Sequence, residues 1–107
     1  MRLSREIAEA LFMAVNNQLN PPSVSELFLF GSRVEDQKKG GDIDLLLVTD
    51  APTKKIAQSM RLELKAGLRK AAKDQKVDLL VATKEEMATD PFLMSLGNLL
   101  SLGKWER

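Results

Sequence analysis

Apolar residues recur every three to four positions at the start of the chain, which is the spacing of an amphipathic helix. We expect this helix between Ser4 and about Asn17, with Leu11 and Val15 on its buried stripe and Ser4 as a candidate N-cap. The Asn-Pro-Pro sequence at 20–22 predicts a turn there, because the residue before a proline is driven out of the helical conformation.

Three short apolar runs are typical of buried strands. The first is Glu26–Phe30, which ends at a glycine, and the third is Val77–Ala82. The second, Asp42–Thr49, is apolar on both faces after Asp44. A strand of this kind is expected at the centre of a sheet, with cover on both sides.

Two more helices are expected after the second strand. Lys54 to about Asp74 has apolar residues at four-residue spacing and predicts one long helix. Asp90 and Pro91 predict the start of a last helix that continues through Leu100 and ends near Gly103.

The segment between the first two strands predicts a short helical turn over 32–37 and a loop over 38–41. The expected order is therefore helix, strand, strand, helix, strand, helix. Residues 1–107 are interpreted as one α/β domain, with a small mixed sheet of about three strands or more packed with helices.

The composition narrows the chemistry that the chain can perform. There is no cysteine, histidine or tyrosine among its 107 residues. This excludes disulfides, thiolate or imidazole zinc sites, a cysteine or tyrosine nucleophile and a Ser-His-Asp triad. Any reaction must use carboxylates, lysines, arginines, hydroxyls and backbone amides.

The net charge of +1 conceals a basic segment. Residues 51–76 carry eight basic and two acidic side chains. They form either the solvated face of a helix or a patch that attracts phosphates, nucleic acid or an acidic partner. Nucleic acid is the weaker expectation, because no aromatic residues alternate with these cations to stack on bases.

The chain has no apolar stretch of about 20 residues, so no membrane span is expected. It also has no cysteine, and its first residues lack the apolar block of a signal peptide. Together these features favour a cytoplasmic location.

Gly31 and Ser32 follow the first strand, where the chain is expected to enter a helical turn. A glycine lets a bulky ligand approach the backbone, and free amides at a helix start bind phosphate. A simple turn is the alternative explanation for this dipeptide.

Asp42 and Asp44 lie two residues apart on the second strand, so their side chains point to one face, with Cα atoms about 7 Å apart. Two carboxylates this close disfavour each other's ionisation unless a cation lies between them. Asp78, near the start of the third strand, joins them if the two strands are neighbours. Oxygen ligands alone favour Mg²⁺ or Mn²⁺. These are the parts of a two-metal site for phosphoryl transfer, although solvated aspartates at strand starts are the simpler alternative.

The run from Leu29 to Arg33, followed after eight residues by Asp42-Ile43-Asp44-Leu45, resembles the nucleotidyltransferase superfamily that includes DNA polymerase beta. The short chain is similar to the minimal, stand-alone branch, and the resemblance covers about residues 4–83. It implies that Gly31, Ser32 and Arg33 bind the phosphates of ATP or another nucleoside triphosphate. It also implies that Asp42, Asp44 and Asp78 bind Mg²⁺ or Mn²⁺ and that Asp78 is the base.

Small members of this branch often pair with an all-helical toxin ribonuclease as its antitoxin, and some transfer AMP to a hydroxyl of that partner. The resemblance therefore implies a protein adenylyltransferase acting on such a toxin. The apolar residues of the expected last helix form a candidate partner surface. These are Phe92, Leu93, Met94, Leu96, Leu99, Leu100, Leu102 and Trp105.

Two alternatives remain open from the sequence. Glu35 and Asp36 replace residues that in many minimal members are basic or small, so the chain could be a catalytically weak antitoxin that acts by binding its toxin. It could also be a nucleotidyltransferase for a small hydroxylated molecule. The acceptor, the base preference of the nucleotide and the formation of a homo-oligomer are left open.

Overall fold

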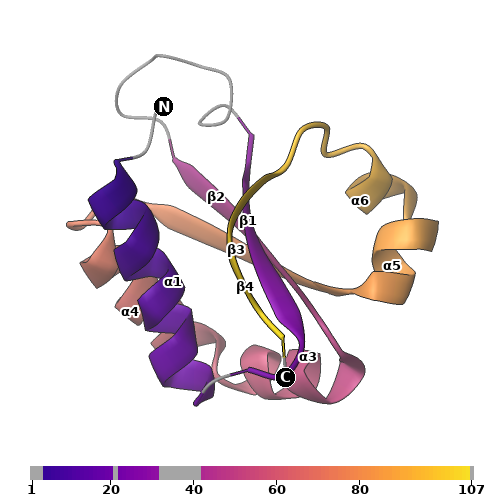
Figure 1. The fold of residues 1–107 in the computed structure, drawn as a ribbon, viewed down its shortest axis with the longest axis horizontal. Helices are drawn as coiled ribbons and strands as arrows, with labels where there is room; N and C mark the ends of the chain where they lie inside the picture. Colours follow the sequence, from indigo (N-terminus) through magenta and orange to yellow (C-terminus); the bar gives the residue numbers. More distant parts are fainter. Residues whose placement is uncertain (1–3, 21, 32–41, 107) are drawn as a thin grey trace.

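A four-stranded sheet in the order β3-β2-β1-β4 runs through the middle of the protein (Figure 1). The computed structural model describes residues 4–20, 22–31 and 42–106. The strands are β1 (Ser25–Phe30), β2 (Ile43–Thr49), β3 (Val77–Thr83) and β4 (Leu100–Trp105). β1 pairs antiparallel with both β2 and β4, whereas β2 pairs parallel with β3. The expected small mixed α/β sheet is confirmed.

Helices lie on both faces of this sheet (Figure 1). They are α1 (Arg5–Leu19), α3 (Ala51–Ser59), α4 (Arg61–Ala71), α5 (Lys84–Thr89) and α6 (Pro91–Met94). α1 and α4 cover one face, and α5 and α6 cover part of the other. Ser4 caps α1, as expected, by accepting a hydrogen bond from the Ile7 N–H at 3.1 Å. None of the described helices has the length and apolar character that crossing a membrane requires.

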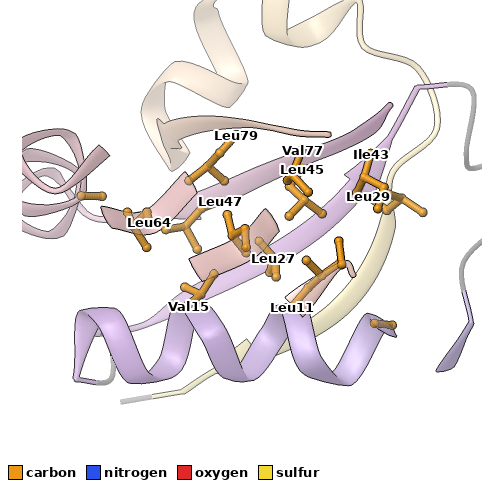
Figure 2. Close-up of a cluster of buried hydrophobic side chains, with 14 of the residues drawn as sticks. Leu11, Val15, Leu27, Leu29, Ile43, Leu45, Leu47, Leu64, Val77 and Leu79 are labelled. Atoms are coloured by element: carbon orange, nitrogen blue, oxygen red, sulfur yellow. The ribbon is translucent and has the colours of Figure 1, made fainter. Parts of the chain in front are cut away.

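The larger hydrophobic core fills the space between the sheet and the α1–α4 layer (Figure 2). Its strand side chains come mainly from alternate positions of β1, β2 and β3, because successive residues of a strand point to opposite faces. Those from β2 are Ile43, Leu45 and Leu47, and all three are fully buried. A smaller core of Leu46, Val48, Ala82 and Leu93 lies on the other face, under α5 and α6.

The expected long helix over 54–74 is two helices. α3 ends at Ser59 and α4 begins at Arg61, and Met60 between them has φ −107° and ψ 21°. Asp50 caps α3 by accepting a hydrogen bond from the Thr53 N–H at 2.8 Å. The apolar spacing continues across Met60, so periodicity alone does not show the break.

The expected last helix over 90–103 is wrong for most of its length. Only Pro91–Met94 is helical, and residues 100–105 form strand β4 at the edge of the sheet. Gly97, at φ +82°, turns the chain between them. β4 pairs antiparallel with β1, and the Trp105 ring stacks on Phe12 of α1 with the centroids 4.1 Å apart. The eight apolar residues therefore do not share one helix surface.

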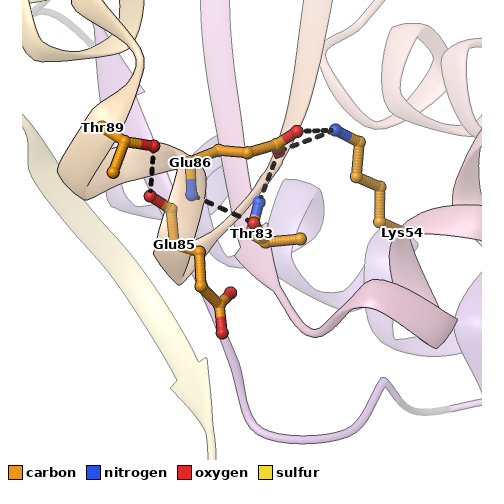
Figure 3. A network of polar contacts seen from close by, with 5 residues as sticks. All are labelled: Lys54, Thr83, Glu85, Glu86 and Thr89. Carbon is orange, nitrogen blue, oxygen red and sulfur yellow. Dashed lines mark hydrogen bonds and ion pairs between the residues drawn. The ribbon is translucent and has the colours of Figure 1, made fainter.

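Helix α5 was not expected, although the sequence carries its signature. Thr83 and Glu86 form a capping box, in which the Thr83 hydroxyl accepts from the Glu86 N–H and the Glu86 carboxylate accepts from the Thr83 N–H (Figure 3). Lys54 donates to both oxygens of the same carboxylate at 2.7 and 2.8 Å. These contacts join α5 to α3. The turn and loop expected over 32–37 and 38–41 lie outside the described residues.

A substitution at Gly103 tests whether β4 takes the place of the expected last helix. A Cβ at Gly103 would lie 2.5 Å from two carbons of the Phe12 ring, and its φ is +152°. We therefore expect Gly103→Ala to lower the free energy of unfolding in urea by about 1–3 kcal/mol. Gly67 in α4 is the matched control, since a Cβ there meets its nearest atom at 3.5 Å.

Gly67→Ala should raise the free energy of unfolding by about 0.4–1 kcal/mol, because alanine favours the helix. If Gly103→Ala were as stable as the wild type, β4 would not lie against Phe12 in the way described.

Candidate functional site

The parallel pairing of β2 with β3 sets two of the three predicted carboxylates side by side. Asp44 and Asp78 are partners in the strand register. Paired residues of neighbouring strands point to the same face, and the strands lie about 4.8 Å apart. Asp44 follows buried Ile43 and Asp78 follows buried Val77, so both carboxylates point away from the larger core. Both side chains are half-buried.

The surroundings of Asp44 disfavour its charged form. Burial raises the pKa of Asp44 above its usual value, and the negative charges of Asp78 and Asp42 raise it further. Lys76 acts in the opposite direction and does not cancel these effects. Asp44 is thus the carboxylate whose ionisation is opposed by its burial and by its two acidic neighbours.

Asp42 and Asp78 each have a lysine nearby. The Asp42 carboxylate, just before β2, lies 3.8 Å from Lys76 Nζ, and the Asp78 Oδ1 lies 3.9 Å from Lys65 Nζ. Both distances are too long for strong hydrogen bonds, and all four side chains are partly exposed, so these ion pairs are weak. The basic composition of residues 51–76 predicts cations in this region, but it does not identify Lys65 and Lys76 as the two that lie beside the carboxylates.

Gly31 lies directly against the Asp44 carboxylate. It ends β1 with φ +81°, a conformation that favours glycine, and a Cβ there would lie 2.5 Å from Asp44 Oδ2. Any side chain at this position would displace the carboxylate. The structure thus brings predicted residues Gly31, Asp44 and Asp78 together, whereas the predicted residues Ser32 and Arg33 lie outside the described residues.

The donor atoms of this site suit a hard divalent cation. They are carboxylate oxygens, the ligands that Mg²⁺ and Mn²⁺ prefer, and a cation would relieve the repulsion that raises the pKa of Asp44. Within residues 4–20, 22–31 and 42–106, however, no three acidic, histidine or cysteine side chains are gathered closely enough to hold a metal. To share one cation, Asp42 and Asp78 would have to turn from their lysines toward Asp44.

A basic cavity adjoins the carboxylates at the β3 edge of the sheet. Its volume is about 440 Å³. It is lined by Lys65, Ala66, Arg69, Lys76 and Val77. Two of these residues are the lysines next to Asp78 and Asp42. The site therefore combines two half-buried carboxylates, Asp44 and Asp78, with a cavity lined by cationic side chains.

A comparison with protein families gives one finding for this chain. A family model described as a nucleotidyltransferase domain matches residues 12–95. The match includes Gly31, Asp42, Asp44 and Asp78, that is, each carboxylate of the site and the glycine that contacts Asp44. No curated protein matches the chain.

Because the pKa of Asp44 is raised, the difference in stability between the wild type and an Asp44→Asn variant should depend on pH. Ionised Asp44 destabilises the folded state above its folded pKa, and this loss disappears as the pH falls below the unfolded value near 3.8. We expect Asp44→Asn to unfold at a higher urea concentration than the wild type at pH 7. The difference in the free energy of unfolding should shrink steadily toward pH 4.

The comparison of wild type and variant at each pH removes the effect of carboxylates that do not interact with Asp44. A difference that stayed constant or grew as the pH fell would contradict the described environment of Asp44.

Proposed function

The chain belongs to the nucleotidyltransferase domain family, and we propose that it transfers a nucleoside monophosphate, AMP from ATP, to a hydroxyl group of a partner protein. The coarser part, nucleotidyl transfer, follows from the family. The observation that most strongly supports a transfer site here is that Gly31, Asp44 and Asp78 lie together, with Asp44 and Asp78 as register partners and Gly31 leaving room for the Asp44 carboxylate.

The roles proposed for the residues are those that the resemblance to the family implies. Gly31, with Ser32 and Arg33 after it, would bind the phosphates of the nucleotide at the end of β1. Asp42, Asp44 and Asp78 would hold Mg²⁺ or Mn²⁺. When bound, these cations would lower the pKa of the acceptor hydroxyl and neutralise charge on the phosphates.

The reaction is an in-line displacement at the α-phosphorus. The acceptor oxygen forms a bond to this phosphorus while the bond to the oxygen that bridges to the β-phosphate breaks, and pyrophosphate leaves. The proton of the acceptor hydroxyl passes to the Asp78 carboxylate. Asp78 suits this role because β3 is an edge strand, where an acceptor can approach from outside the sheet.

The proposed partner is an all-helical toxin ribonuclease, with this chain as its antitoxin in the cytoplasm. Exposed apolar side chains support a protein partner. Phe92 and Met94 of α6 are 59% and 64% exposed, and Leu100 at the start of β4 is also exposed. Although they do not form the single helix surface that was expected, they lie in one short stretch of the chain.

A second candidate function has its own support. The described carboxylates do not form a group of three that could hold a metal, and lysines lie beside two of them. This arrangement favours an antitoxin that acts by binding its toxin, with transfer weak or absent. The two candidates differ in whether the carboxylates bind a cation.

Asp44→Asn should reduce nucleotide transfer by about 100-fold or more, because a carboxylate proposed to hold the cations is lost. The measurement is transfer of label from α-³²P-ATP to the co-purified partner in the presence of Mg²⁺. Glu9→Gln is the matched control. Glu9 is an exposed carboxylate of α1 that pairs only weakly with Arg5 at 3.6 Å, and α1 covers the face of the sheet from which Asp44 points away, so the activity of this variant should equal that of the wild type. Unchanged label transfer by Asp44→Asn would refute the proposed enzyme.

Mn²⁺ should stabilise the wild type against urea, since a cation that binds only the folded state adds to its stability. At about 100 times the dissociation constant the gain is about 2.7 kcal/mol. The Asp44→Asn variant should show little of this gain, and Glu9→Gln should show all of it. If wild type and Asp44→Asn responded alike, the binding-only antitoxin would be the better description.

A further inference from the structure

The outer face of α4 carries cationic and apolar side chains that the proposed reaction does not use. One stripe of the helix carries four residues that are separated by three, one and three positions. They are Leu62, Lys65, Ala66 and Arg69. The opposite side of α4 is buried through Leu64 and Leu68. We call the stripe, together with Lys76 before β3, the α4 face.

The α4 face adjoins the site. Lys65 lies 3.9 Å from Asp78 and Lys76 lies 3.8 Å from Asp42. Lys65, Arg69 and Lys76 line the cavity of about 440 Å³ described above. A ligand in this cavity would contact three cationic side chains and would lie close to Asp78, the carboxylate proposed to receive the proton.

One side chain of the α4 face is apolar and almost wholly in solvent. Leu62 is 81% exposed, the largest value among the exposed large hydrophobic residues of the described chain. An apolar side chain at the end of a cationic stripe matches a protein segment that offers both acidic and apolar residues. It contributes nothing to binding a phosphate backbone, and the stripe has no aromatic residue for stacking on bases.

We propose that the α4 face docks an acidic segment of the partner protein that also presents an apolar residue to Leu62 and carries the acceptor hydroxyl beside Asp78. The proposal rests on the function proposed above and names the chemistry of the partner. A carboxylate of the partner would replace Asp78 as the neighbour of Lys65. The same contact would therefore free Asp78 at the moment when the acceptor arrives.

An NMR titration with model peptides tests this docking without any nucleotide. The probe is a peptide of about twelve residues in which aspartate and glutamate surround one leucine and one serine. One comparator has lysine at every acidic position, and the other is a short oligothymidylate. For the acidic peptide we expect amide shifts concentrated in residues 61–69 and 76–78, and weaker binding when salt is raised from about 50 to about 500 mM.

Variants of exposed residues give the quantitative test. Arg69→Gln with Lys76→Gln should weaken binding of the acidic peptide about fivefold or more, and Leu62→Ala about threefold. Lys104→Gln is the matched control. Lys104 lies on β4 at the opposite edge of the sheet, so removing one positive charge there should leave binding unchanged. The amide spectrum of each variant shows directly whether it is folded.

Three results would overturn the proposal. They are equal binding of the lysine peptide, shifts that lie outside the α4 face, and tighter binding of the oligothymidylate to the same residues. The last would identify a nucleic-acid surface. Because label transfer is measured separately, transfer that depends on Asp44 without peptide binding refutes only the docking. Peptide binding without transfer refutes only the enzyme.

Discussion

The parallel pairing of β2 with β3 is the constraint on which the rest of the structure depends. Two parallel neighbours cannot be joined by a tight turn, so the chain must cross over between them, and α3 and α4 are that crossover. The register places Asp44 beside Asp78. The crossover brings α4 to the same edge of the sheet, so that a cationic helix face lies next to an acidic pair.

Much of the fold could be predicted because its main elements have strong periodic patterns. The bounds of β1, β2 and β3 agree with their apolar runs to within a residue, and α1 runs two residues beyond its expected end. The break at Met60 could not be predicted, because the apolar spacing is the same on both sides of it. The last segment was misassigned because its apolar run is too short to distinguish helix from strand by spacing. Pairing with β1, a contact distant in the sequence, decides it.

The site was predictable where it depends on local spacing and not where it depends on packing. Alternation along the expected strand 42–49 predicted that Asp42 and Asp44 share one face, and the apolar runs made β2 and β3 plausible neighbours. The position of Gly31 against Asp44 and the placing of lysines beside Asp42 and Asp78 follow from how β1 ends and where the crossover lies. No pattern within one segment contains that information. The negative charges near Asp44 lower the stability of the folded state, and β2, which is otherwise apolar, tolerates this loss.

The stacking of Trp105 on Phe12 gives the protein an internal optical reporter. Trp105 is the sole tryptophan of the chain, and its indole N–H donates to Asn16 of α1 at 3.0 Å. Its emission therefore responds to whether the strand at the far end of the sequence has reached the first helix. Because contacts between such distant residues close the largest loop, they form late in folding when local structure comes first. Fluorescence from this one indole would thus follow completion of the sheet, while backbone signals from the helices would follow earlier events.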